Sequence, residues 1–146
     1  MSEGDQEANL DLIRDLLQAL EEQDEDLYYD VVADDFEFSP HGLDADEYLD
    51  GELAFYDAFP DLTNALDFMF ADSNFVAFRW TFQGTHTGGG GPGPLEEYEA
   101  THNEVDVTGI NIARIEDGEI AEMWAEWDTL ELCSQLGIIT FVESGE

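Results

Sequence analysis

One stretch of this chain contains no acidic residue, although acidic residues are abundant in the rest. No Asp or Glu occurs from Ser73 through Leu95, whereas the overall frequency of 37 in 146 residues predicts about six there. Large apolar residues occupy every second position within it: Val76, Phe78, Trp80 and Phe82. This alternation predicts a β-strand over residues 75–87 with one buried face, and it places His86 on that face. The rest of the chain must therefore supply elements that cover this strand.

The charge of the chain limits its surroundings and its partners. Three arginines and no lysine oppose the 37 acidic residues, so the net charge is −34, yet 43% of the residues are hydrophobic. We interpret the chain as an acidic, halophilic protein, because salt at 1 M shortens the Debye length to about 3 Å and screens such repulsion. An acidic surface that docks a basic partner is the alternative. Nucleic acid is not an expected partner, since three scattered arginines cannot neutralise a phosphate track.

A single domain over residues 1–146 is expected from the length, with loose tails at 1–5 and 142–146. Cys133 is the only cysteine, so no internal disulfide can form, and its neighbours Leu132 and Leu136 predict a small core residue. No apolar run approaches the roughly 20 residues that span a bilayer, and the N-terminus lacks the pattern of a signal peptide. We therefore expect a cytoplasmic location without membrane association.

Hydrophobic periodicity predicts an α+β domain. Helical spacing covers residues 5–22, 25–33, 46–59 and 129–136, and strands are predicted near residues 36–38, 62–70, 75–87, 98–115 and 120–127. Helices that come first and four consecutive strands that follow indicate a curved antiparallel sheet with helices packed on its concave face. Such a sheet forms a cone, which is a natural pocket for a small molecule.

A glycine- and proline-rich segment, Gly88 to Pro94, separates two of these strands. It cannot form a helix or a central strand. A phosphate-binding loop is disfavoured because no lysine follows it and no helix begins there. We interpret it as a connector or a lid over the expected pocket.

Asp128 lies where the last predicted strand meets the last predicted helix. A carboxylate at this junction can act as an acid or a base, particularly if Trp124 and Trp127 provide apolar surroundings that raise its pKa. The structural alternative is a helix N-cap, in which the side chain accepts a hydrogen bond from the backbone of the first helical turn. For His86 the corresponding alternative is a core histidine whose ring is satisfied by the backbone.

Several short motifs, taken in order, resemble the SnoaL-like polyketide cyclases, or ester cyclases, of the nuclear-transport-factor-2-like superfamily. The resemblance extends from about Asn9 to Gly137 and rests on these words: FPDL from Phe59, GTHTG from Gly84, ARIEDGEIAEMW from Ala113, the aspartate at 128 and QLG from Gln135. It implies an α+β cone and, commonly, a homodimer formed through the sheet. The family's loop after GTHTG usually has a Pro-Pro-Thr-Gly-like run, and this chain has GGGGPGP there instead.

The resemblance also implies roles for particular residues. In these cyclases an aspartate at the position of Asp128 is the general acid and base, and no cofactor takes part. His86 is then the candidate that polarises a carbonyl or enolate oxygen, and His41 resembles a position that often lines the cavity. The remaining candidates for substrate contact are aromatic: Tyr56, Trp80, Trp124 and Trp127.

These observations favour an enzyme that performs acid/base chemistry on a small, largely apolar carbonyl compound. The alternative is a non-catalytic module of the same fold that binds a small molecule or dimerises, because fold does not decide function. No metal site is expected, since His41, His86 and His102 lack ligand spacing. Arg79 shares the outer sheet face with Thr81, and it is expected to pair with a carboxylate either on the same sheet or across a dimer interface.

Overall fold

The computed structural model of the chain describes residues 3–39 and 41–139. Within these residues the chain forms four α-helices: α1 (Glu3–Glu22), α2 (Glu25–Val31), α3 (Ala45–Ala58) and α4 (Thr129–Leu136). The expected tails fall partly outside the described residues, because α1 already begins at Glu3 and residues 140–146 are not described. None of the helices in the described ranges is long and apolar enough to cross a bilayer.

Five strands form one open mixed sheet in the order β1-β5-β4-β3-β2. Their bounds are β1 (Val32–Ser39), β2 (Thr63–Asp72), β3 (Phe75–Thr85), β4 (Glu104–Glu116) and β5 (Glu119–Trp127). The strand predicted from the acid-free stretch is β3, which is paired on both sides, by β2 and β4. The α+β prediction is therefore confirmed, and a central position in the sheet explains why the stretch carries no acid.

The first strand differs from the sequence prediction in length and direction. The second helix was predicted to reach Ala33, but it ends at Val31 and β1 begins at once. β1 runs parallel to β5 at the edge of the sheet, whereas the other pairs are antiparallel. The pairing of β1 with β5 could not be predicted from the local sequence, because the paired residues are more than 80 positions apart in the chain.

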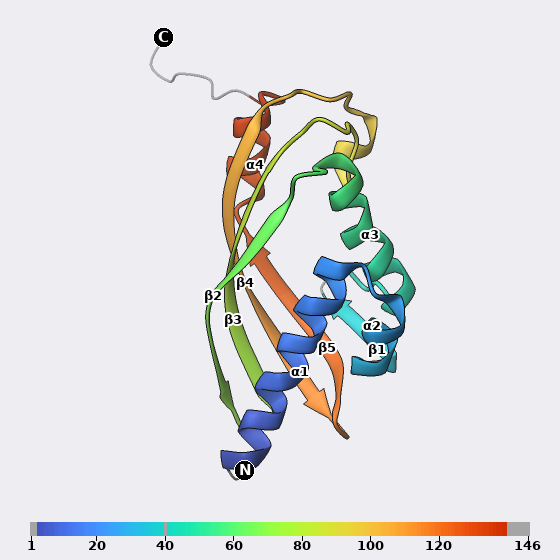
Figure 1. Cartoon of the computed structure of the whole chain (residues 1–146), viewed down its shortest axis with the longest axis vertical. Coiled ribbons are helices and arrows are strands. Elements are labelled where there is room, and N and C mark those ends of the chain that lie inside the picture. The colour runs from blue at the N-terminus through green and yellow to red at the C-terminus, as the bar shows by residue number, and fades with distance from the viewer. Residues whose placement is uncertain (1–2, 40, 140–146) are drawn as a thin grey trace.

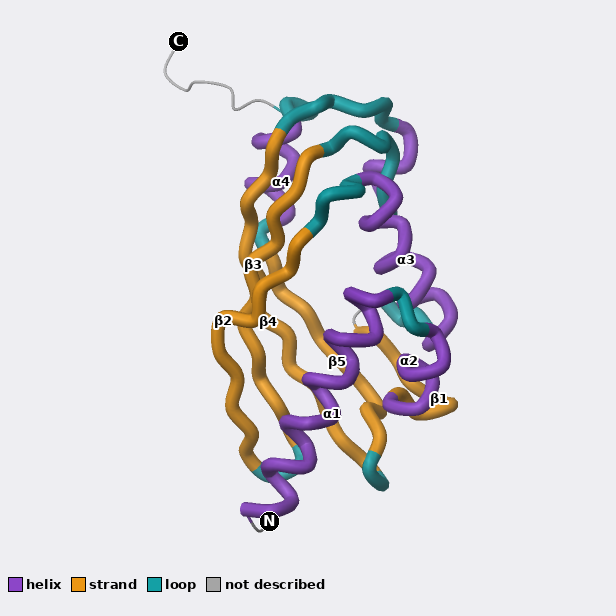
Figure 2. The backbone as a smooth tube through the Cα atoms, viewed as in Figure 1, coloured by secondary structure: helices purple, strands orange, loops and turns teal. Residues whose placement is uncertain are grey.

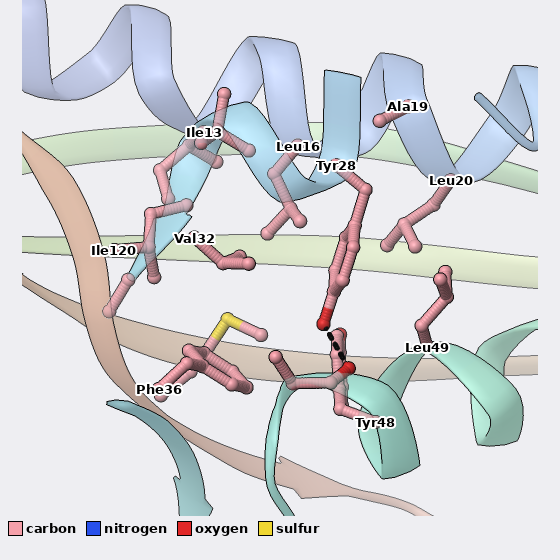
Figure 3. Packing of buried hydrophobic residues seen from close by; sticks show 14 of the residues in the cluster. Ile13, Leu16, Ala19, Leu20, Tyr28, Val32, Phe36, Tyr48, Leu49 and Ile120 are labelled. Carbon is pink, nitrogen blue, oxygen red and sulfur yellow. Dashed lines mark hydrogen bonds between the residues drawn. The ribbon is translucent and has the colours of Figure 1, made fainter. Parts of the chain in front are cut away.

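Helices α1, α2 and α3 lie together on one face of the curved sheet (Figures 1 and 2). The buried face of α1 carries Ile13, Leu16 and Leu20, and these side chains meet residues of α2, α3 and β5 in the main core. Figure 3 shows the Tyr28 hydroxyl donating a hydrogen bond to the carbonyl oxygen of Ala45, 2.6 Å away. This bond satisfies the only polar atom of a fully buried tyrosine side chain and joins α2 to the start of α3.

Side-chain caps fix where α3 and α4 begin. Asp44 precedes α3 and forms a capping box with Glu47, in which each side chain accepts from the other residue's backbone N–H. Asp128 caps α4 through a bond from the Glu131 N–H to its Oδ1, 3.0 Å long. Both helices therefore begin where the sequence pattern predicts, within one residue.

The segment between β3 and β4 folds back over the end of α3. The long strand predicted over residues 98–115 begins only at Glu104, and a short 3-10 helix, Gly93–Glu97, precedes it. The Gly88 N–H donates to the carbonyl oxygen of Ala58 at 3.0 Å, and a Cβ at Gly88 would lie 1.8 Å from the Asp57 carbonyl oxygen. Only glycine permits this approach, so the glycine-rich segment is packed against the C-terminal end of α3.

Helix α4 is hydrogen-bonded to the edge of β4 beyond the end of β5. The side-chain amide of Gln135 accepts from the Asp106 N–H at 2.7 Å and donates to the Asp106 carbonyl oxygen at 3.1 Å. One side chain thus replaces both bonds that a neighbouring strand would make at this residue. Leu132 and Leu136 on the other side of α4 pack into a second core with Phe59 and Phe82.

Candidate functional site

The inward face of α3 carries an unusual group of polar side chains. Tyr48, Glu52 and Tyr56 are spaced four residues apart, so they lie above one another on one side of the helix. Tyr48 is buried between α3 and the rings of Phe36 and Phe38, whose centroids lie 5.6 Å and 4.7 Å away. Because Tyr48 faces the core, Glu52 and Tyr56 face the interior as well.

Glu52 is surrounded by protein yet keeps partial access to solvent. Burial raises the pKa of its carboxyl group from 4.5 to about 7, and a hydrogen bond from Tyr48 opposes the shift in part. Its charge in turn helps to raise the pKa of Tyr56 to about 12, after burial of that phenol. Glu52 is therefore the carboxyl group in the described chain whose protonation is balanced near neutral pH.

Among the described residues no arginine neutralises Glu52, because the three arginines of the chain are engaged elsewhere. Arg14 pairs with Glu7 and Asp11 on the exposed side of α1. The other two lie on the outer face of the sheet: Arg79 pairs with Asp67 at 2.6 Å, and Arg114 pairs with Glu116 and Glu122. The Arg79–Asp67 pair is one of the two pairings that the sequence left open, that with a carboxylate on the same sheet.

A group of aromatic rings follows Glu52 along the interior. Phe55, one turn further on α3, lies 5.5 Å from Phe82 and 5.9 Å from Trp127, centroid to centroid. Trp127 lies 6.1 Å from Trp80. Phe55, Trp80 and Trp127 are all partly accessible, although they point inward. Two of the five predicted substrate contacts, Trp80 and Trp127, are thus brought together with a helix residue that the sequence analysis did not single out.

A glycine and an asparagine of β4 hold these tryptophans in place. The indole N–H of Trp80 donates to Oδ1 of the buried Asn111 at 2.9 Å. A Cβ at Gly109 would lie 2.3 Å from the Trp80 ring and 2.6 Å from the Trp127 Cβ. The absence of a side chain at Gly109 therefore makes room for both indoles over the sheet.

Asp128 directly follows Trp127 and is exposed. Its Oδ1 forms the N-cap of α4, and among the described residues no hydrogen bond to Oδ2 is formed. The capping alternative considered for this residue is thus present in the structure. A catalytic role for Asp128 stays a prediction that would rely on the second oxygen.

His86 is fully buried, and both of its ring nitrogens are engaged. Nδ1 accepts from the Thr101 N–H at 3.1 Å, so the proton is on Nε2, which donates to the Gly90 carbonyl oxygen at 2.9 Å. These bonds anchor the glycine-rich segment to the end of β3. The role of His86 in polarising a substrate oxygen stays a prediction, and it would require one of these bonds to break.

The other predicted contacts lie apart from this group. His41 is exposed and stacks on Phe38 at 6.0 Å. Trp124 is opposite Ile112 in the β4–β5 register and faces the outer side of the sheet, away from Trp127. Tyr56 remains on the inward face of α3. No three side chains of metal-ligating type are grouped to hold an ion in the described residues.

Two hollows open on the outside of the molecule. One, of about 420 Å³, is apolar and lies on the outer sheet face between Phe70, Phe75 and Trp124. The other, of about 470 Å³, is polar and lies beside α4, with Asp61 and Gln135 among its lining residues. Hydrogen bonds from Thr85 lower the pKa of Asp61, so this carboxylate is fixed in its ionised form.

Comparison with known proteins identifies the family. The family model described as SnoaL-like polyketide cyclase matches residues 10–136, most of the chain. The chain belongs to the SnoaL-like polyketide cyclase family. The sequence resemblance is thereby confirmed. No curated protein matches the chain in sequence.

Several solved structures share this fold. TsrD from Streptomyces laurentii is similar with a TM-score of 0.79 and 23% identity, over 95% of this chain and 99% of that one. A SnoaL-like polyketide cyclase from Agrobacterium tumefaciens is similar with a TM-score of 0.72 and 20% identity, over 88% of this chain and 98% of that one. At these identities the likeness concerns the fold.

Sequence reasoning missed Glu52, because carboxylates are too frequent in this chain for one of them to stand out. The available signal was its position: it is the acidic residue placed four residues from two tyrosines on the apolar side of a predicted helix. A carboxyl group with a pKa near 7 beside aromatic rings can accept or donate a proton at neutral pH. The interior of this SnoaL-like protein thus carries polar groups of α3 and β4 as well as apolar rings.

Proposed function

We propose that this SnoaL-like protein is a cofactor-free enzyme of the cyclase or isomerase type. Its substrate is a small, largely apolar carbonyl compound that binds on the inner face of the sheet, against the rings of Phe55, Trp80 and Trp127. The observation that carries the proposal is the partial exposure of these inward aromatic rings beside a few polar groups. Family membership supports the same chemistry.

In this proposal Asp128 is the base that removes a proton from the carbon next to the carbonyl group. Asp128 directly follows Trp127 of the aromatic group, and it matches the aspartate that the family resemblance implies, which supports the role. The cap bond uses Oδ1 and leaves Oδ2 for the proton. His41 and Tyr56 would contact the substrate at the periphery, and His86 would polarise its oxygen only after release from Gly90.

The test follows α-proton exchange in deuterium oxide with 1-tetralone, 2-tetralone and ethyl acetoacetate as probes, measured by NMR in molar KCl. We expect the protein to accelerate exchange for at least one probe, and Asp128→Asn to reduce that rate by about 10²-fold or more. Asparagine is an equally good N-cap, so the variant keeps its fold. Exchange that is absent for every probe, or equal in the variant, would overturn the proposal.

The exposure of Asp128 and its use as a cap favour a second candidate, a non-catalytic binding module. Such a module would bind 1-tetralone, seen as quenching of tryptophan fluorescence, without accelerating exchange. If Trp127→Leu loses the quenching, and if α-proton exchange proceeds at the buffer rate with both the wild-type protein and the variant, the binding module is favoured and the enzyme is excluded.

We also propose that the outer face of the sheet is covered by a second copy of the chain. Large apolar side chains are exposed there: Phe68 (55%), Phe70 (60%), Phe75 (41%), Ile110 (49%) and Ile112 (42%). A contiguous apolar surface of this kind marks an interaction site. Below α4 no described helix covers this face (Figure 1).

Charge supports a second copy as the occupant. Two of the three arginines lie on this face, each paired with a carboxylate of the same sheet. In a chain of net charge −34, these two arginines reduce the repulsion between identical molecules that meet on this face. Sedimentation analysis in molar KCl should give a dimer, and a monomer at all concentrations would exclude this interface.

The same charge and the free Cys133 support a cytoplasm rich in salt as the compartment. Unfolding measured from 0.1 M to 3 M KCl should show stability that rises with salt.

A further inference from the structure

We propose that Glu52 is the proton donor of the inner site, which gives a hydrogen bond and then a proton to the carbonyl oxygen of the bound substrate. The inference rests on the proposed function. It adds a catalytic residue that neither the family position nor the sequence motifs indicate.

The placement of Glu52 points to the inner site. It projects from the inward face of α3 between Tyr48 and Tyr56, one turn before Phe55, whose ring lies 5.9 Å from that of Trp127. Glu52 therefore lies on the helix side of the rings against which the substrate of the proposed function binds, and Asp128 follows one of these rings, Trp127, in the chain.

The described residues provide no counter-ion for Glu52. The groups that interact with Glu52 are all neutral or acidic: Tyr28 of α2, and Tyr48 and Tyr56 of α3. Glu21 of α1 is also acidic, and its charge raises the pKa of Tyr56 as that of Glu52 does. With all three arginines paired elsewhere, no described cationic side chain holds Glu52 as a carboxylate. A carboxyl group enclosed without a cation keeps its proton and can donate it.

Tyr48 supports the carboxyl group of Glu52. Its hydroxyl is hydrogen-bonded to Glu52, and the ring is fixed by Phe36 and Phe38 of β1. The bond to Glu52 thus comes from a side chain that is itself held in place. We assign Tyr48 as a positioning residue, since it acts on the substrate through Glu52.

The two carboxyl groups, of Asp128 and Glu52, supply and accept every proton that the reaction moves. The Asp128 carboxylate takes the α-proton, the C–H electron pair forms the carbon–carbon double bond, and the carbonyl oxygen takes the Glu52 proton. The product is an enol, with Asp128 now protonated and Glu52 ionised. In ring closure the enol carbon attacks a second carbonyl carbon, whose oxygen takes the proton from Asp128. The enol proton then returns to Glu52.

The first test reads the carboxyl group directly by carbon-13 NMR of the side-chain carboxyl carbons as a function of pH. We expect one signal to titrate near neutrality, to be missing in Glu52→Gln and to remain in Asp50→Asn, the matched change on the solvent side of α3. In Tyr48→Phe the midpoint should move to higher pH, because the bond that favours the ionised form is lost. A spectrum without such a signal, or with one unaffected by Glu52→Gln, would overturn the proposal.

The second test uses 1-tetralone as the bound probe and its carbonyl stretching frequency as the readout. In the wild-type protein below the titration midpoint, the stretch should shift to lower frequency. The shift should be absent in Glu52→Leu, which removes every donor at this position. An equal shift in that variant would show that another group donates and would exclude Glu52.

The two proposals fail in different ways. If the carbonyl stretch shifts only when Glu52 is present but no α-protons exchange, Glu52 donates a hydrogen bond and the proposed enzymatic activity is excluded. Exchange that Glu52→Gln leaves unchanged would keep the enzyme and exclude Glu52 as donor. If both hold, Glu52→Gln should lower the exchange rate by about 10²-fold and abolish its decline above the midpoint.

Discussion

The two faces of the sheet both leave large aromatic side chains partly uncovered, but they differ in what accompanies these rings. On the inner face, Trp80 bonds to Asn111 and lies beside Trp127, and Glu52 and Tyr56 face the same interior from α3. On the outer face, Phe68 and Phe70 lie among other apolar residues, and the arginines of this face are already paired with carboxylates of the sheet.

This difference indicates different occupants. A small molecule needs a few polar groups that converge on it, which the inner face provides. A second protein surface needs a broad apolar area whose polar neighbours are already satisfied, which the outer face provides. Four changes to the chain test this contrast.

The largest effect is expected at the outer face. Phe70→Glu places a carboxylate twice in a symmetric interface, where like charges and desolvation cost several kcal/mol. The dimer dissociation constant should rise by about 10³-fold in sedimentation experiments in molar KCl. The control is Leu130→Glu on α4, equally exposed but outside this face, which should leave the dimer intact.

Glu52→Gln should change the dependence of stability on pH. The folded-state pKa of Glu52 is about 7 against an ordinary value of 4.5, so the folded chain binds more protons between these values. The contribution of Glu52 is therefore favourable below about pH 4.5 and is lost as the pH rises through 7, by up to about 3 kcal/mol. In urea unfolding, the free energy of unfolding of Glu52→Gln relative to wild type should be higher at pH 8 than at pH 4 by about this amount. A constant difference across this range would contradict the burial of the carboxyl group.

Gly109→Ala tests whether the inner rings need their present positions. The added Cβ would overlap the Trp80 ring, so the indole must shift away from Asn111, at a cost of about 2 kcal/mol. Tryptophan fluorescence and urea unfolding measure the two effects. Gly51→Ala is the control, because a Cβ at this helical position meets no atom within 4 Å and should stabilise α3 by up to about 1 kcal/mol.

The smallest effect separates two roles of Asp128. Asp128→Ala removes the cap of α4 and should cost about 1 kcal/mol, whereas Asp128→Asn should be nearly neutral. If exchange of 1-tetralone falls equally in both variants, the carboxylate itself is needed. If it falls only in Asp128→Ala, the cap alone matters, and the base must be sought elsewhere.

Much of the fold follows from the sequence, because local patterns decide it. Alternation in β3 and the spacing of α4 are complete within about ten residues, and both elements appear where predicted. The parallel pairing of β1 with β5 depends on distant contacts and has no local signature. Residues 98–103 read as strand, but the loop carrying Leu95 and the bonds to His86 draw them out of the sheet.

The candidate site was predictable in part. Strand parity separates Trp124 from Trp127, because residues three apart on a strand point to opposite faces, and applying it would have assigned Trp124 to the outer face. The importance of Glu52 could not be ranked among 37 acidic residues, since it depends on enclosure and on the engagement of every arginine. Composition can count the charges, but only the structure shows which of them lacks a partner.

The paired bonds between Gln135 and Asp106 bear on which changes of length the chain tolerates. They fix α4 against β4 at a single residue, and α4 starts immediately after β5. An insertion between Trp127 and Thr129 would displace both hydrogen bonds at once and uncover the edge of β4. An insertion in the turn between β4 and β5, around Asp117 and Gly118, would disturb neither. Peptide tags or reporter segments therefore belong at that turn.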